Sequence, residues 1–306
     1  MRFATFLRYG SYPIIFGSVS AFVLIWSTLG LSPWPAFLLA AIAGLVAIAW
    51  LERVQPFERD WNEDHNDTLT DAIHVLVNLL LMSGTAYLLH LLMGRVPTTM
   101  IWPQAWPIAL QVLLAGLIVD FGLYAMHRAS HHVPWLWRLH AIHHSSERLY
   151  WMNGDRRHPL SALILAGPGL TAAVLLGAPA AVITAWLTLL TVHLGFQHAN
   201  LDYSLGPLRR WIGGAELHRW HHRRDYTDAQ VNFGEFWLLW DWLLGTRFDD
   251  PKAVGVDDVG LDDAEFPTSY MGQLRWPFSR TGYGDATGAM RSTSSSAESA
   301  ATEPET

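Results

Sequence analysis

The chain has 306 residues, of which 51% are apolar, 15% are charged and 16 are tryptophan, a composition unusual for a soluble globular protein. It contains no cysteine, which excludes disulfides and cysteine-held zinc or iron–sulfur sites, so any metal chemistry must use histidine and carboxylates. The formal net charge of −7 gives no reason to expect a nucleic-acid partner. These numbers favour a helical protein that crosses a membrane several times.

Two nearly uncharged stretches open the chain and predict a transmembrane helical hairpin over residues 1–51. They run from Tyr12 to Gly30 and from Trp34 to Leu51, with a turn at Ser32-Pro33. Each is close to the length of about 20 residues that crosses a hydrocarbon core. A cleaved signal peptide is the alternative for the first stretch, but no Ala-x-Ala-like cleavage site is present and a second apolar stretch follows at once.

Apolar stretches return after the polar segment from Glu52 to Asp71. Residues 72–94 predict a third span, and residues 108–126 predict a fourth that ends at the first histidines. The prolines and tryptophans of residues 95–107 predict a loop at the lipid headgroups. Residues 160–177 and 180–191 form either two tilted spans or a re-entrant hairpin, and both return the chain to the side it left. The prediction is an all-α polytopic protein with four to six spans.

The C-terminal part is predicted to stay on one membrane surface. Residues 237–244 are too short to span and predict a helix lying at the interface. Residues 249–278 form an extension, and the Ser, Thr, Ala, Gly and Glu that dominate residues 279–306 predict a disordered tail. This topology leaves Arg95 alone on the side away from the histidines, so the positive-inside rule places the histidines in the cytoplasm. We expect a multi-pass protein of a bacterial inner membrane.

Histidine is concentrated between residues 127 and 222, where twelve of the fifteen histidines lie. Eight of them form three patterns, namely His127-x3-His131, His140-x2-His143-His144 and His218-x2-His221-His222. These spacings place the rings of each pattern on one side of a helix. Clustered neutral imidazoles at a membrane face would be poorly satisfied, whereas two metal ions would accept all their lone pairs. The sequence therefore predicts a helical cap that holds a histidine-rich dimetal site.

Three of the remaining histidines are further candidates for metal ligands. His198 is the best additional candidate, and His158 and His193 are also candidates because they flank the fifth and sixth apolar stretches. The isolated His65, His74, His90 and His132 are more simply explained as hydrogen-bonded or solvated residues.

Asp120 lies in the apolar stretch that precedes His127, where a carboxylate is costly and calls for a function or a partner. We expect Asp120 to accept the outer ring N–H of a metal-binding histidine and so to fix the orientation of that ring. The alternative is an aspartate bonded to a neighbouring backbone group.

The histidine patterns and their flanks resemble the fatty acid hydroxylase/sterol desaturase superfamily of integral membrane di-iron enzymes. The resemblance covers residues 52–248 and rests on residues 120–128, 140–147, 156–159, 196–200, 218–222, 232–234 and 240–246. Residues 205–208 and 145–147 are also similar to the alkylglycerol monooxygenase branch. Arg223 and Leu244 depart from the usual pattern, in which a small residue and Phe are common, and these departures bear on the substrate rather than on the metal site.

The resemblance implies a catalytic domain over residues 52–248 that binds two iron ions. It implies hydroxylation or desaturation of an unactivated C–H bond in a sterol-like, fatty acyl or ether lipid. The reaction would use O2 and electrons from a separate reductase, ferredoxin or cytochrome b5-like protein. Imidazole suits iron, zinc and copper alike, so the ligands do not identify the metal, and zinc can replace iron on purification.

Two other classes of function compete with this interpretation. A zinc hydrolase is disfavoured because His-Glu-x-x-His is absent and no carboxylate lies inside a histidine pattern to act as general base. A metal transporter or sensor would place polar ligands near the middle of several spans, whereas these histidines lie at the ends of spans.

Overall fold

A computed structural model describes residues 2–92, 95, 99, 101–250, 252, 254–262 and 266–279. Within these residues every regular element is a helix, apart from three isolated β-bridges, so the predicted all-α fold is confirmed. The predicted disordered tail lies outside the described residues except for Ser279, as does part of the predicted loop at residues 95–107.

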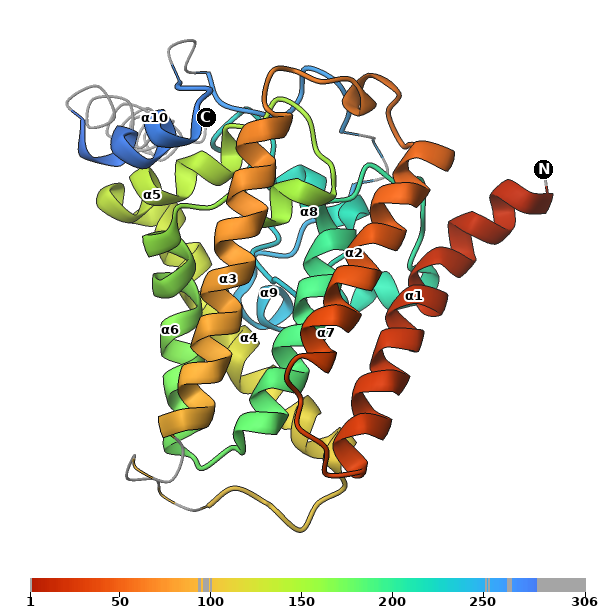
Figure 1. Cartoon of the computed structure of the whole chain (residues 1–306). Coiled ribbons are helices and arrows are strands. Elements are labelled where there is room, and N and C mark those ends of the chain that lie inside the picture. The colour runs from red at the N-terminus through yellow and green to blue at the C-terminus, as the bar shows by residue number, and fades with distance from the viewer. Residues whose placement is uncertain are drawn as a thin grey trace, which may run out of the picture.

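Six long helices run back and forth between the two ends of the molecule (Figure 1). They are α1 (Arg2–Thr28), α2 (Ala36–Val54), α3 (Thr68–Leu92), α4 (Ile108–His132), α6 (Pro159–Leu175) and α7 (Ala180–His198). All except α6, which is shorter, are long and apolar enough to cross a membrane, which gives five candidate spans. The count agrees with the predicted four to six spans.

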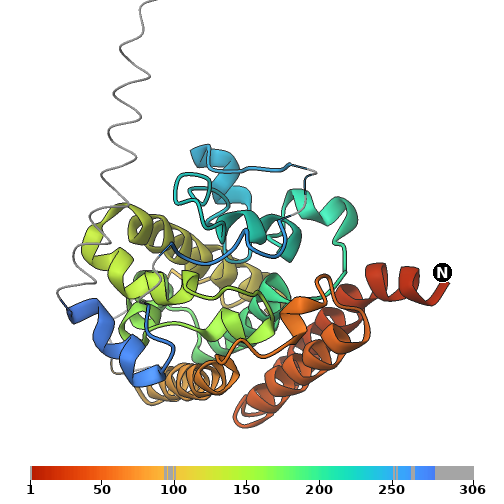
Figure 2. The ribbon, with the colours of Figure 1, turned by 90° about the horizontal axis from the view of Figure 1, so that it is seen from above.

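The short elements lie mainly at one end of this bundle, which we call the cap, whereas α9 lies nearer the middle of the long helices (Figure 1). They are α5 (Pro134–His144), α8 (Ala215–His221), α9 (Leu239–Leu244), α10 (Tyr270–Arg275) and the 3-10 turns η1 (Asp60–Asn62), η2 (Trp151–Asp155), η3 (Gly206–Arg210) and η4 (Trp276–Phe278). Seen from above, the α1–α2 hairpin lies at one edge of the molecule and α5 and α10 lie at the opposite edge (Figure 2). The helix α9 falls inside the predicted interfacial segment and exposes Trp242, Leu243 and Leu244.

Helix α7 lies at the centre of the bundle and packs against α1, α2, α3 and α4. Its sequence is apolar around its whole circumference, as a helix enclosed by others requires. Helix α6 packs closely on α4, because a Cβ at Gly122 would lie only 2.4 Å from the backbone nitrogen of Gly169. The α6–α7 pair runs antiparallel along the bundle and returns the chain to the cap, as both predicted arrangements require.

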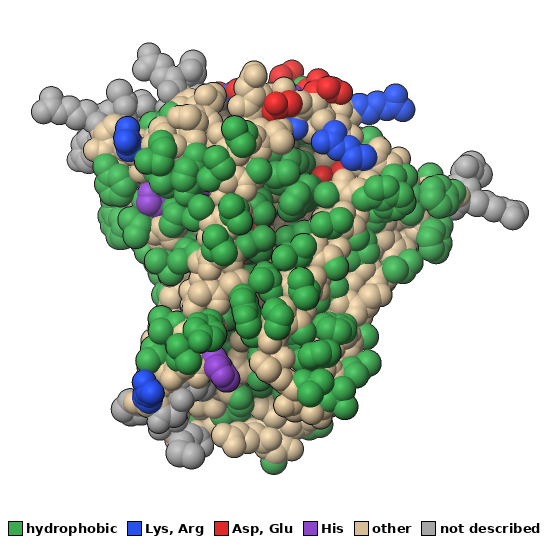
Figure 3. All heavy atoms as spheres, viewed as in Figure 1, with side chains coloured by type: hydrophobic (Ala, Val, Ile, Leu, Met, Phe, Trp, Pro, Cys, Tyr) green, Lys and Arg blue, Asp and Glu red, His purple; other side chains and the backbone are tan. Residues whose placement is uncertain are grey.

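The outer surface matches a membrane environment. Hydrophobic side chains cover the middle of the face in Figure 3, whereas the acidic side chains on that face gather at the cap end. Leu76, Leu80 and Leu88 of α3 are among the large apolar side chains that remain exposed on the long helices. Such a band is stable in lipid and costly in water.

Buried ion pairs fix the cap to the ends of the long helices. Arg148 donates to Asp67 at 2.6 Å, and Arg156 donates to Asp71 of α3 at 2.7 Å. Glu52 of α2 accepts the backbone N–H groups of Trp151 and Asn200 at 2.8 and 2.7 Å. These contacts hold above the bundle the segments that follow the second histidine pattern and His198 in the chain.

Candidate metal centre

Nine histidines converge from four parts of the chain at the junction of bundle and cap. His127 and His131 close α4, and His198 closes α7. Helix α5, which has Pro134 in its first turn, carries His140, His143 and His144, and the segment at α8 carries His218, His221 and His222. All nine side chains are buried, with at most 2% of their surface exposed. The structure therefore brings together all eight histidines of the three patterns and His198.

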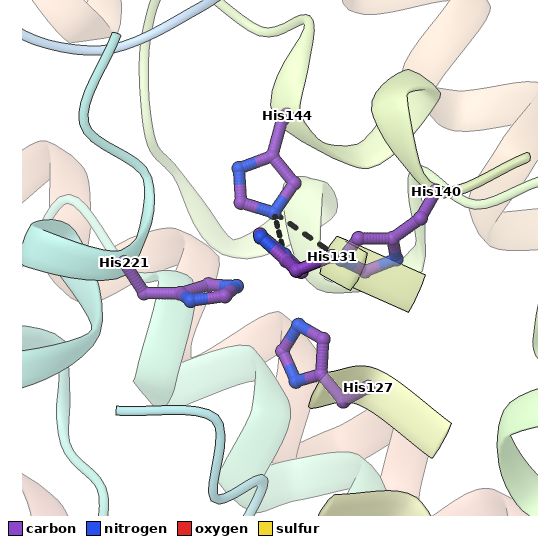
Figure 4. Close-up of side chains that lie close together, drawn as sticks. All are labelled: His127, His131, His140, His144 and His221. Atoms are coloured by element: carbon purple, nitrogen blue, oxygen red, sulfur yellow. Dashed lines mark hydrogen bonds between the residues drawn. The ribbon is translucent and has the colours of Figure 1, made fainter. Parts of the chain in front are cut away.

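The nine histidines form two adjacent groups. The first group contains His127, His131, His140, His144 and His221, and the second contains His143, His198, His218 and His222. Within each group, one ring nitrogen of every residue lies within 4.8 Å of the others. Figure 4 shows the five rings of the first group pointing toward one another. The rings of His144 and His222 are 4.6 Å apart between centroids, so the two groups are neighbours.

Backbone carbonyls fix the orientation of three of these rings. The Nδ1 atoms of His127, His198 and His221 lie 2.9 Å from the carbonyl oxygens of Phe233, Leu194 and Val231. A carbonyl can only accept, so each Nδ1 carries the proton and each Nε2 carries a lone pair. Among the described residues, Nε2 of His127 and of His221 is buried without a hydrogen-bond partner. A ligating histidine shows this arrangement, with its outer N–H bonded and its inner lone pair free for a metal ion.

The second group cannot satisfy its own nitrogens. Nε2 atoms follow one another at 3.2 Å from His143 to His198, at 3.0 Å from His198 to His218 and at 3.1 Å from His218 to His222. Each ring nitrogen has a single proton or a single lone pair, so the nitrogens of His198 and His218 cannot each form two hydrogen bonds along this chain of contacts. A metal ion accepts lone pairs from all four nitrogens. The donor set therefore fits one metal ion in each group.

The histidines of the cap are held in the neutral form that binds metal. Burial lowers the pKa of His140, His143, His144, His218, His221 and His222 well below the usual value, and repulsion from neighbouring rings adds to the effect. At neutral pH these rings therefore keep their lone pairs.

Asp120 contacts the backbone rather than a histidine. Its two carboxylate oxygens accept the N–H groups of Phe236 at 2.8 Å and Trp237 at 3.1 Å. This corrects the predicted bond to a ligand ring and matches the alternative of a backbone partner. The reason is that the segment before α9 folds back onto α4 and covers the carboxylate.

The same segment contains contacts that the sequence did not reveal. Asp241 accepts the N–H groups of Phe233 and Gly234 at 2.8 and 2.9 Å, so two aspartates together hold the loop whose Phe233 carbonyl orients His127. In this loop Glu235 is fully buried, lies 3.5 Å from Nδ1 of His127 and accepts from Arg157 at 3.0 Å. The sequence feature that could have pointed to Glu235 is a carboxylate within an apolar stretch. No sequence spacing connects Glu235 to His127.

The two further candidates, His158 and His193, lie outside both groups. Nδ1 of His158 accepts the N–H of Leu160 at the start of α6, and Nε2 lies 3.3 Å from the carbonyl of Leu274. His193 bonds the hydroxyl of Tyr12 and the carbonyl of Gly213, each at 2.9 Å. Both nitrogens of each ring are therefore already engaged.

An apolar chamber of about 380 Å³ lies between α3, α4, α6 and α7. Leu, Ala, Val and Met side chains make up most of its lining, and Asn78, Gly154, Asp155 and Arg157 contribute at its cap end. A Cβ at Gly154 would lie 3.2 Å from Nδ1 of His198, so this end of the chamber adjoins the second histidine group. A chamber of this size and lining can hold an alkyl chain.

Comparisons with known proteins agree with this site. The family model described as fatty acid hydroxylase matches residues 112–246, which include all nine histidines. The ornithine lipid hydroxylase OlsE of Rhizobium tropici is 33% identical over 280 residues, which cover 81% of this chain and 84% of that protein. The very-long-chain aldehyde decarbonylase GL1-8 of Oryza sativa subsp. indica is 30% identical over 60% of this chain and 69% of that protein.

A third relative bears on the similarity to the alkylglycerol monooxygenase branch. The alkylglycerol monooxygenase of Danio rerio is 28% identical over 205 residues, which cover 60% of this chain and 44% of that protein. No solved structure matches the chain. The family model and the long match to a lipid hydroxylase agree with the histidine groups, and the chain belongs to the fatty acid hydroxylase family of lipid-modifying oxygenases.

Proposed function

We propose that the protein is a membrane-bound di-iron oxygenase that hydroxylates an unactivated C–H bond of a lipid. It would use O2 and electrons from a separate donor protein. The observation that supports this proposal is that Gly154, which lines the apolar chamber, lies next to the outer side of the His198 ring in the second histidine group. When bound, two iron ions would supply the redox chemistry that activates oxygen, which zinc cannot supply.

The residues of the chain have separate parts in this reaction. The carbonyls of Phe233, Leu194 and Val231 orient three ligand rings before any metal binds. The chamber takes up the alkyl chain and keeps water from it, and its cap end presents a C–H bond to the histidine groups. Desaturation would use the same residues and the same chamber.

An ornithine lipid is the substrate that we propose to test first. The support is the relative of that name, whose similarity extends over 84% of its length. Lipid extracts from cells that make ornithine lipids should contain a product with one added oxygen atom only when the gene is present. The matched control is His221→Ala. Loss of two hydrogens without added oxygen would identify desaturation, and unchanged lipids of every class would count against the proposal.

We also propose that the cap faces the cytoplasm of a bacterial cell. The start of α1 and the cap lie at the same end of the bundle, and Arg95 follows α3 at the other end (Figure 1). Nearly all basic residues of the described part of the chain therefore lie on the cap side, as the positive-inside rule expects of a cytoplasmic surface. Reporter fusions at Arg95 and Ser279 should report opposite sides of the inner membrane, and matching sides would contradict this orientation.

A further inference from the structure

Asp155, at the end of η2, places a carboxylate at the cap end of the apolar chamber. Among the described residues, no group donates a hydrogen bond to this carboxylate and none forms an ion pair with it. The residue is only partly buried, which leaves it room for a partner. This carboxylate therefore has no donor from the described protein and is open to a ligand in the chamber.

The polar neighbours of Asp155 donate to other acceptors and not to this carboxylate. Arg157 pairs with the fully buried Glu235 at 3.0 Å. The amide nitrogen of Asn78 donates to the backbone carbonyls of Asp155 and Arg157, at 2.7 and 3.1 Å. In the metal-free chain Arg157 and Glu235 cancel in charge, so the ionised Asp155 leaves this end of the chamber net negative.

The carboxylate of Asp155 favours a ligand that carries a hydrogen-bond donor or a positive charge. Burial raises the pKa of Asp155 to about 6, and nearby Arg157 lowers it only in part. Placing an unpaired carboxylate against apolar surface is costly, and a hydrogen-bond donor or a cation on the ligand removes that cost. A fatty acid or a lipid phosphate would instead bring a second negative charge to the same end. A simple ester offers no donor.

We propose that Asp155 selects the lipid by binding an ammonium or amide N–H group at the root of the alkyl chain that fills the chamber. The inference deepens the proposed function and rests on it for the role of the chamber as the substrate site. Because Gly154 adjoins both the chamber and His198, the carbons next to that nitrogen lie nearest to the histidine groups. Asp155 belongs to neither histidine group, so its part is to position the substrate.

The experiment measures binding and needs neither metal nor turnover. The full chain is placed in phosphatidylcholine nanodiscs, with empty nanodiscs as background. Four radiolabelled probes of one chain length are compared: dodecylammonium, N-methyldodecanamide, N,N-dimethyldodecanamide and dodecanoate. We expect dodecylammonium to bind at least about tenfold more tightly than dodecanoate, and the amide with an N–H to bind more tightly than the dimethylated one.

Asp155→Asn should remove the preference for dodecylammonium, by about tenfold in Kd, while the affinity for N,N-dimethyldodecanamide stays unchanged and shows that the chamber is intact. Asp262→Asn, at an exposed carboxylate outside the chamber lining, is the matched control and should behave as the parent chain. Equal binding of dodecylammonium and dodecanoate by the parent chain would overturn the proposal, as would an unchanged preference in Asp155→Asn.

The binding experiment and the test for lipid oxidation can fail independently of each other. Selective binding without lipid oxidation in cells would reject the proposed reaction and keep the role of Asp155 in binding. Oxidised lipid without selective binding would keep the reaction and reject the role of Asp155.

Discussion

Replacing His221 with Ala is expected to reduce the bound metal from two ions per chain to one or none and to abolish product formation. His221 belongs to the first group, its Nδ1 is held by the Val231 carbonyl, and its buried Nε2 has no partner among the described residues. Removing the ring takes one donor from the group and leaves a cavity beside four other imidazoles. His143→Ala should have the same effect on the second group.

The matched control for both variants is His158→Ala, because His158 is a histidine of the cap whose ring lies outside both groups. Elemental analysis of protein extracted under metal-retaining conditions should give about two ions per chain for the parent and for His158→Ala. Less than one ion in the parent chain, or an equal loss in His158→Ala, would show that the two groups are not the metal sites.

Replacing Asp120 with Ala is expected to lower the free energy of unfolding by roughly 2–6 kcal/mol and to weaken metal binding. The change leaves the backbone N–H groups of Phe236 and Trp237 buried without an acceptor, and each unsatisfied group costs about 1–3 kcal/mol. The loop that carries the Phe233 carbonyl then loses one of its two anchors, so the orientation of His127 loosens as well.

The measurement is denaturant unfolding in detergent, together with metal content. Asp120→Asn keeps one acceptor oxygen in a side chain of the same size and should fall between Asp120→Ala and the parent chain. Asp262→Asn at the exposed surface should leave stability within about 0.5 kcal/mol. An Asp120→Ala protein as stable as the parent would remove the role we assign to these hydrogen bonds.

The eight histidines of the three patterns were predictable because their signal is local. Spacings of three and four residues on a helix align rings whatever the rest of the chain does. Helix geometry also explains why His193 lies outside both groups. Five residues on a helix correspond to about 140°, so His193 points away from the face of α7 that carries His198. It faces Tyr12 of α1 instead.

The contacts that orient the ligands were not predictable from spacing. The Phe233 carbonyl reaches His127 across 106 positions of sequence, and Asp120 meets Phe236 across 116. These pairings depend on how the irregular segment between α8 and α9 folds onto α4, and an irregular segment has no periodicity to read. In the same way, apolarity alone did not separate a pair of long helices from a re-entrant hairpin in residues 160–191.

The most direct test of a redox dimetal centre is the incorporation of labelled O2 into lipid by iron-loaded and zinc-loaded protein, each with added reductase and reductant. Both metals satisfy the same imidazoles, so the two forms should melt at similar temperatures, above the metal-free chain. We expect labelled hydroxylated lipid from the iron form and none from the zinc form. Equal product from both forms would contradict oxygen activation at this site.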